Sequence, residues 1–391
     1  MESYNFLHFQ DKKKRMSSTV IKEIYTKKDF NTFFDLPYKL FHDDQYWVPP
    51  MLGDEKNIFT SNINPALEFC KFKMFLAFKD NKIAGRVAAI INPKVNELYG
   101  QRRIRFGWLD FIDDIEVAQQ LLQAVEVWGK QEGMTEMVGP QGFCNMDRAG
   151  MVVDGFKVET PGSCNYNPEY YPKILEELGF QKEVDTIQYE MPATQPIPDK
   201  VLKINNIIQE KYKLKIVKGI SKKMLMKRYG VKFFETLNIS YAGLFGFVPL
   251  NEKQIDYYIK QYFPFLNLKM LCFVVDENDD IVGFGVSLPS LSSALKRCKG
   301  KLFPFGWFYL LKALKNYEKI DLLLTGVTPE WQNKGIHSLY HAELNKNYIE
   351  LGVKTAITNP QLESNEAHRI WLKYNSKILI RRRIYVKMIQ I

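Results

Sequence analysis

The stretch Asp321-Leu322-Leu323-Leu324-Thr325-Gly326-Val327-Thr328-Pro329-Glu330-Trp331-Gln332-Asn333-Lys334-Gly335-Ile336-His337 decides the fold that we predict. Its apolar first part is typical of a strand, and the region from Gln332 to Leu351 is typical of a helix. Unpaired backbone N–H groups gather where such a helix begins, and the helix dipole there favours an anion such as phosphate. The candidate anion site comprises Val327, Gln332, Asn333, Lys334, Gly335, Ile336 and His337. An ordinary strand-turn-helix with a tight glycine turn is the alternative interpretation.

The two halves of the chain follow one plan. Residues 74–91 contain two β-rich runs around a polar turn, and residues 271–286 contain two more, so each half is expected to hold a hairpin. The glycines in the second run of each hairpin, Gly85 and Gly283, are 198 residues apart. A spacing near half the chain length indicates an internal repeat.

The ends of the halves repeat as well. Each half ends in a predicted helix and a strand, and the tyrosines of these strands, Tyr189 and Tyr385, are 196 residues apart. The Pro-rich stretch that follows the first of these strands is typical of a linker. We therefore predict an α/β fold with a mixed sheet, built as two similar domains: residues 1–190, a linker at residues 191–204, and residues 205–391.

The order V-x-P-x-x-Q-x-x-G-I from Val327 to Ile336 resembles motif A of the GNAT acyltransferases, Q/R-x-x-G-x-G/A. The resemblance implies two GNAT-like domains in tandem, with acetyl-CoA or another acyl-CoA as co-substrate. In the family this turn holds the pyrophosphate, and the backbone of the preceding strand pairs with the pantetheine arm. His337 stands where the family has Gly or Ala, a departure that would crowd the pyrophosphate or contact it.

The segment that starts at Asn359 resembles GNAT motif B, which implies three candidate catalytic residues. Glu363 and Asn365 would act as a base or orient the amine, or they are an acidic residue and an N-cap at the start of a helix. Trp371 replaces the tyrosine that protonates the leaving thiolate in the family. Tyr374, one turn further on, would take that role or would pack in the core.

From residue 30 to its end the chain is similar to a bacterial family of tandem-GNAT proteins. The matching segments include Tyr46–Pro50, Gly139-Pro140, Asn167–Tyr171 and Arg383–Tyr385. In the first half the motif A turn is replaced by the acidic stretch Phe111–Glu116, which has no glycine. We therefore predict that the first domain has lost cofactor binding and serves as a partner to the second.

The resemblance implies an N-acyltransferase that moves an acyl group, expected to be acetyl, to an unidentified amine in the groove between the domains. The expected acceptor is a small molecule or a peptide, and the expected assembly is a monomer or a homodimer. Two alternatives remain open: a non-catalytic GNAT-fold protein that binds a ligand or acts as a scaffold, and a transferase that uses aminoacyl-tRNA. Nucleic acid and a peripheral membrane contact are not expected partners.

The composition agrees with a folded protein of the cytoplasm. Of 391 residues, 46% are hydrophobic and 25% charged, which excludes a disordered or collagen-like chain. The 54 Lys and Arg outnumber the 44 Asp and Glu, a net charge of +10 that suits anionic partners. The five cysteines form no C-x-x-C pair, the N-terminus has no apolar signal region, and no run reaches 18 apolar residues. No metal is expected, because nothing nearby completes a ligand set with His337 and His341.

Two further segments carry open interpretations. Residues 288–314 interrupt the second half with a basic cluster followed by aromatic residues. They would touch an anionic membrane, line an acyl groove, or form an inserted helix packed between the domains, and we expect the last. Arg381–Arg383 would reach a phosphate of CoA or nucleic acid, or form the solvated charged face of an edge strand, which is the commoner arrangement.

Overall fold

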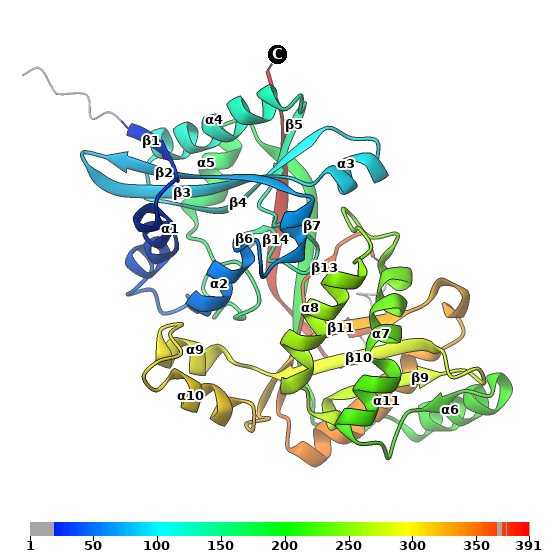
Figure 1. Cartoon of the computed structure of the whole chain (residues 1–391). Coiled ribbons are helices and arrows are strands. Elements are labelled where there is room, and N and C mark those ends of the chain that lie inside the picture. Colours follow the sequence, from blue (N-terminus) through cyan, green and yellow to red (C-terminus); the bar gives the residue numbers. More distant parts are fainter. Residues whose placement is uncertain (1–18, 366–369, 373, 391) are drawn as a thin grey trace, which may run out of the picture.

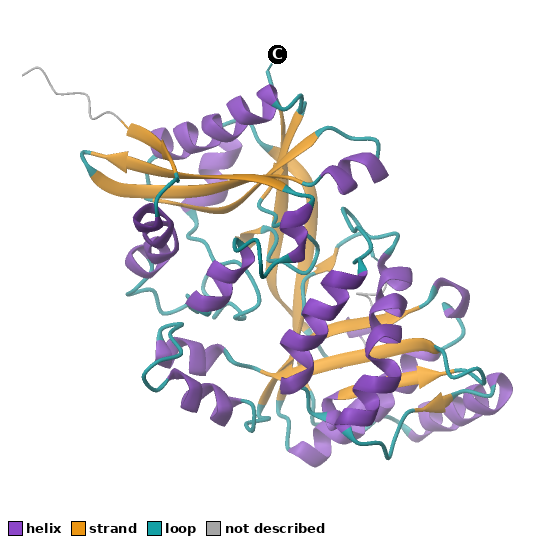
Figure 2. Cartoon of the chain, viewed as in Figure 1, coloured by secondary structure: helices purple, strands orange, loops and turns teal. Residues whose placement is uncertain are grey.

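The computed structural model describes residues 19–365, 370–372 and 374–390, which form one continuous mixed sheet with helices on both of its faces (Figures 1 and 2). The strands of the first half are β1 (Thr19–Glu23), β2 (Lys71–Lys79), β3 (Lys82–Ile91), β4 (Arg103–Phe111), β5 (Glu136–Gly139), β6 (Met151–Asp154) and β7 (Gln181–Pro192). Its helices are α1 (Lys27–Leu40), α2 (Leu52–Ile58), α3 (Pro93–Leu98), α4 (Ile115–Gln131) and α5 (Tyr170–Glu177).

The second half repeats this order with additions. Its strands are β8 (Lys215–Ile216), β9 (Leu271–Val275), β10 (Ile281–Pro289), β11 (Lys319–Val327), β12 (Thr355–Thr358), β13 (Gln361–Leu362) and β14 (Lys377–Met388). Its helices are α6 (Asp199–Tyr212), α7 (Lys222–Tyr241), α8 (Glu252–Tyr262), α9 (Ser292–Cys298), α10 (Gly306–Ala313) and α11 (Ile336–Leu351). The predicted hairpins are confirmed as β2–β3 and β9–β10.

The last strand of each half is exchanged with the other half. The strand order is β1-β2-β3-β4-β5-β14-β7-β12-β11-β10-β9-β8. Thus β14 pairs with β5, with Tyr385 opposite Gly139, and β7 pairs with β12, with Met191 opposite Ala356. The two exchanged strands also pair with each other, and Figure 1 shows them side by side through the centre of the molecule. The halves therefore share one sheet.

The exchange extends to the hydrophobic cores. Tyr385 of β14 is fully buried in the core of the first half, together with Leu121 of α4. Tyr189 of β7 is buried in the core of the second half, together with Leu344 of α11. The two tyrosines that mark the sequence repeat thus occupy equivalent places, each in the core of the opposite half.

The paired glycines have one structural role. A Cβ on Gly85 of β3 would lie 2.7 Å from the Leu121 side chain of α4. A Cβ on Gly283 of β10 would lie 2.6 Å from the Ile336 side chain of α11. In each half, glycine lets the helix that follows the next strand pack closely against the hairpin, which explains the repeat at a spacing of 198 residues.

Some predicted boundaries differ from the structure. Strand β7 extends to Pro192 and α6 begins at Asp199, so the connection that we predicted at 191–204 is confined to residues 193–198. Helix α11 begins at Ile336 rather than Gln332, because Asn333 and Gly335 adopt positive φ values of 61° and 81° that a helix cannot contain. Most of the helix predicted before Asn375 lies outside the described residues.

We predict that the halves unfold together, because each supplies a strand to the core of the other. Leu121→Ala and Leu344→Ala should each lower the free energy of unfolding by about 2–5 kcal/mol. Both should shift one common transition in urea, followed by circular dichroism and tryptophan fluorescence. Val127→Ala, at a half-exposed position on α4, is the control and should change little. Two transitions, each sensitive to one substitution, would contradict this prediction.

Candidate functional site

Strands β11 and β12 separate partway along their length. They pair in parallel from Lys319 to Leu322 of β11, and the N–H of Asn359 then donates to the Leu322 carbonyl at 2.9 Å. The Asn359 side-chain amide donates to the next carbonyl, that of Leu323, at 2.7 Å. Strand β11 continues to Val327 with no strand partner on this side among the described residues. The result is a V-shaped opening between two parallel strands.

A bulge lies at the mouth of this opening. Val286 and Ser287 of β10 pair with Leu324 and Leu322 of β11, so Leu323 is an extra residue in the ladder. A bulge bends its strand and locally disrupts the pairing. The first half has a similar irregularity in β4, and the N–H of Gln141 donates to the Phe106 carbonyl at 2.8 Å, as Asn359 does in the second half. Both halves therefore keep the same strand separation.

The residues that we predicted to form an anion site lie together at the start of α11. Gly335 is the N-cap residue at φ 81°, and no side chain caps the helix. The Lys334 ammonium lies 4.7 Å from the centre of the Trp331 ring. The described side chains of Gln332, Asn333 and His337 are exposed, whereas Ile336 is buried in the core. Val327 lies at the end of β11 and accepts a long hydrogen bond from the Gln332 amide, at 3.4 Å.

Helix α6 covers part of this turn. Asn205 of α6 donates to the Ser338 carbonyl of α11 at 3.1 Å. A Cβ on Gly335 would lie 2.6 Å from the end of the Ile208 side chain. Any larger residue at position 335 would therefore be strained by its φ and would also push against α6.

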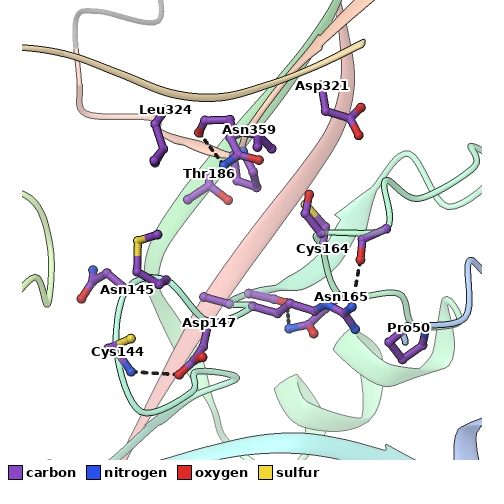
Figure 3. A pocket seen from close by; sticks show the side chains of 18 of the residues that line it. Pro50, Cys144, Asn145, Asp147, Cys164, Asn165, Thr186, Asp321, Leu324 and Asn359 are labelled. Atoms are coloured by element: carbon purple, nitrogen blue, oxygen red, sulfur yellow. Dashed lines mark hydrogen bonds between the residues drawn. The ribbon is translucent and has the colours of Figure 1, made fainter. Parts of the chain in front are cut away.

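The opening between β11 and β12 leads into a cavity of about 710 Å³ between the halves (Figure 3). One wall comes from β11 and the segment after β12, and includes Asp321 and Asn365. Another wall comes from the first half and includes Arg105 and Asp147. Aromatic and aliphatic residues of the second half complete the lining: Phe233, Phe234, Phe247, Phe273, Val286, Leu288, Leu291 and Leu295. The predicted location of a ligand site, between the halves, coincides with this cavity.

The first half contributes a buried polar wall. The Arg86 guanidinium and the Asp110 carboxylate form an ion pair at 2.6 Å, and both residues are at most 7% exposed. Arg105 is also buried and donates to the Gly142 carbonyl at 2.9 Å, and its burial lowers the pKa of its guanidinium. Burial of charged groups costs free energy unless the groups are paired or hydrogen-bonded. Because Arg86, Asp110 and Arg105 have such partners, they form a fixed polar wall of the cavity.

Three carboxyl groups at the cavity have raised pKa values: those of Asp54, Asp147 and Asp321. Burial raises the pKa of Asp321, on β11, to about 6, and it raises the pKa of Asp147, in the first half, to about 6 as well. The Cys144 N–H donates to Asp147 at 3.0 Å. The Oδ1 atom of Asp321 has no hydrogen-bond partner within the described part of the chain. Asp321 therefore keeps one buried carboxyl oxygen without a partner among these residues, and Figure 3 shows the side chain near one end of the cavity.

The three predicted catalytic residues are not brought together in the cavity. Asn365 lines it, but Glu363 and Tyr374 are not among its lining residues. Glu363 accepts hydrogen bonds from Arg381 and, at 3.0 Å, from Lys182, and these cations lower the pKa of its carboxyl group. A base needs the opposite shift. Tyr374 is partly buried, which raises its pKa, and its ring lies 6.2 Å from that of Trp371.

The remaining candidates have structural roles. Cys144 and Cys164 line the cavity, and burial raises the pKa of the Cys144 thiol to about 12, so this thiol is not activated as a nucleophile. Burial and nearby His337 lower the pKa of His341 to about 3, and its ring packs against Trp371 at 5.1 Å. Among the residues that the structure describes, no group of three or more His, Cys, Asp or Glu could hold a metal ion.

The prediction for Arg381–Arg383 is wrong. These residues lie on β14, which is a central strand, so they form no solvated edge. Arg381 and Arg383 form ion pairs with Asp185 at 3.6 and 2.9 Å. Arg382 points to the other face, where it is 1% exposed and donates to the Gln188 side chain.

Sequence reasoning missed Asp321 and the Arg86–Asp110 pair. Asp321 is an isolated acid within the apolar run from Ile320 to Leu324, a pattern that signals a carboxyl group facing an enclosed space. The ion pair joins residues 24 positions apart on neighbouring strands, and no local pattern indicates that contact.

The architecture matches solved structures. A tandem GNAT protein from the clavulanic acid biosynthesis pathway superimposes with a TM-score of 0.54, covering 96% of this chain and 99% of that one, at 10% identity. The chain has a tandem GNAT fold. The predicted fold class and the resemblance to tandem-GNAT proteins are confirmed.

Two curated proteins are similar in sequence to this tandem GNAT chain. Protein YghO of Escherichia coli is 27% identical over 315 residues, 80% of each chain. The bacterial ceramide synthase of Caulobacter vibrioides is 28% identical over 318 residues, 79% of this chain and 80% of that protein. No family model matches the sequence. Within the described chain, no helix has the length and hydrophobicity needed to cross a membrane.

We predict that the Asp321 carboxylate destabilises the native state above pH 6. Its folded pKa lies above the ordinary value of 3.8, so the folded protein binds a proton between about pH 4 and 6 that the unfolded chain does not. Asp321→Asn should therefore raise the free energy of unfolding at pH 7.5 by on the order of 3 kcal/mol. This gain should shrink as the pH falls toward 4. Urea unfolding across this range tests it, with exposed Asp256→Asn as the control, and a gain independent of pH would contradict it.

Proposed function

We propose that the chain is an acyl-CoA-dependent N-acyltransferase. The donor would lie along the open edge of β11, and the amine acceptor would lie in the cavity between the halves. The observation that carries the proposal is the continuity of three features: the glycine turn at the start of α11, the separation of β11 from β12, and the cavity that contains Asp321. The fold, which is shared with an acetyltransferase-type tandem protein, supports an acyl-transfer role.

The turn before α11 suits the phosphates of an acyl-CoA. Gly335 brings the backbone close to a ligand without a side chain, and the uncapped first turn of α11 offers N–H donors. Lys334 adds a positive charge beside these donors. The exposed His337 would contact a phosphate as an additional donor, in place of the small residue that the family has here.

Asp321 is the base that we propose. The neutral amine would attack the thioester carbonyl, a C–N bond would form, and the C–S bond would break to release the thiolate. Asp321 would accept the proton lost by the nitrogen, since a carboxylate with a pKa of about 6 is mostly ionised at neutral pH. A backbone N–H of β11 near the Leu323 bulge would stabilise the oxyanion. Asn365, which lines the cavity, would orient the amine.

The cavity favours an acceptor with a long apolar chain. Its aromatic and aliphatic lining offers a large surface to hydrocarbon, and a volume of about 710 Å³ exceeds the need of a small polar amine. The similarity to a protein named ceramide synthase supports the same class, because a ceramide is the N-acyl derivative of a long-chain amine. The first half would bind no donor, since Asp114 caps α4 where the glycine turn would stand.

We predict that Gly335→Val abolishes CoA binding. The substitution places a branched side chain at φ 81°, 2.6 Å from Ile208, and so displaces the turn that holds the phosphates. Thermal shift and calorimetric titration with CoA, acetyl-CoA and palmitoyl-CoA would measure this. At about 100 Kd of ligand the native protein should gain roughly 2.7 kcal/mol of stability, and the variant none.

The matched control is Gly352→Val. Gly352 ends the same helix at φ 73°, so valine there carries a similar backbone strain, yet a Cβ would meet nothing within 4 Å. This variant should lose stability but keep CoA binding. Equal ligand-induced stabilisation of both variants would overturn the proposed donor site.

We predict that Asp321→Asn lowers the rate of acyl transfer by about 10²–10⁴-fold without weakening CoA binding. The amide has the size of the carboxyl group but accepts no proton. Rates with palmitoyl-CoA and a long-chain amine, followed by release of the free thiol, would measure the loss. Asp147→Asn is the matched control, because the pKa of this cavity carboxyl group is also raised to about 6. A loss confined to the Asp147 variant would assign the base to the first half instead.

A further inference from the structure

The segment from α9 to α10 presents a large exposed apolar surface. Six bulky side chains within ten residues are more than 40% exposed: Leu302, Phe303, Phe305, Trp307, Phe308 and Leu311. Phe303 and Phe305 are the most open, at 76% and 67%. Figure 1 shows α9 and α10 at the edge of the molecule, away from the central strands. We call these six residues the aromatic surface. Neighbouring exposed apolar side chains of this kind are typical of an interaction site.

The segment is held firmly at its base. Lys296 of α9 donates to the Gln45 carbonyl of the first half at 2.5 Å, and the Leu52 N–H donates to the Gly300 carbonyl at 2.9 Å. Leu291 and Leu295 face the cavity on the inner side. The expectation that this insertion packs between the halves therefore fits α9, whereas it is wrong for the outer face of α10.

The segment that carries the aromatic surface is basic. Between Asp280 and Glu318 the sequence contains no acidic residue. Five basic side chains of this segment are exposed: Arg297, Lys299, Lys301, Lys312 and Lys315. Trp and Phe beside Lys and Arg are the combination that settles into the headgroup region of a bilayer with anionic lipids.

We propose that the aromatic surface and the exposed cations of the same segment dock the protein on an anionic phospholipid bilayer. The aromatic rings would enter the headgroup region while the lysines contact lipid phosphates. A second copy of the chain fits this surface poorly, because facing copies would set five cations against five cations. The inner side of the same segment lines the cavity, so a docked protein would hold its cavity wall close to the membrane. The inference stands on this surface alone and does not require the proposed transferase activity.

The test is flotation of the full chain with vesicles of phosphatidylcholine, with and without about one third phosphatidylglycerol. The wild type should float with the mixed vesicles, bind pure phosphatidylcholine at least tenfold more weakly, and dissociate from the mixed vesicles at high salt. Phe303→Ser/Phe305→Ser/Trp307→Ser should weaken binding at least tenfold. The control Val127→Ser/Val231→Ser changes half-exposed apolar residues elsewhere and should bind like the wild type.

A charge-reversed pair makes the test independent of any folding defect in the aromatic variant. Lys299→Glu/Lys301→Glu should also weaken binding at least tenfold, whereas Lys200→Glu/Lys203→Glu, with the same net charge but on α6, should not. Unchanged flotation of the aromatic and charge variants would overturn the proposal. The proposal would also be overturned if the wild type did not bind the vesicles but formed a dimer, and if the aromatic substitutions dissociated that dimer.

Discussion

The pairing of β7 with β14 at the centre of the sheet is the constraint on which the rest of the structure depends. Each strand completes the sheet and core of the half from which it does not come, so neither core is closed until both strands are in place. Side-chain interactions fix the register of β14 against β7. Arg382 of β14 is fully buried beside Gln188. If β14 shifted by one residue against β7, Arg381 and Arg383, which form ion pairs with Asp185, would turn to the buried face in its place. Such buried charge tolerates few alternative arrangements.

The cavity is a consequence of the pairing between β7 and β14. Because the exchanged strands hold the halves in one sheet, the separated ends of β11 and β12 face the polar wall of the first half. The Arg86–Asp110 pair of the first half lines the same cavity as Asp321 and adds fixed charges to its wall. In the proposed function, the first half would have no donor site but would shape the acceptor side of the cavity, which would explain why the two halves share one plan and differ at this turn.

The local features of the fold could be predicted from the sequence, and the non-local ones could not. The hairpins and the roles of Gly85 and Gly283 follow from short patterns repeated at one spacing. The exchange was not predictable, because strands from a repeat fit either half equally well and no pattern specifies the partner. The same limit applies to Glu363, because Arg381 and Lys182, which lie 18 and 181 residues away in the sequence, lower the pKa of its carboxyl group.

Asp321 connects stability, ligand binding and chemistry. Its carboxylate is poorly solvated, and burial is the main cause that raises its pKa to about 6. An apolar chain that fills the cavity would displace the water that still reaches it and would raise the pKa further. The carboxylate would then be a stronger base toward an amine in the filled cavity than in the open one. In the proposed reaction, such a base would be weak in the free protein, where its charge is costly, and would become stronger when the acceptor binds. An asparagine or a leucine at position 321 would make the fold more stable than the buried carboxylate does. A destabilising acid in an apolar strand is therefore what we expect if Asp321 has a catalytic role.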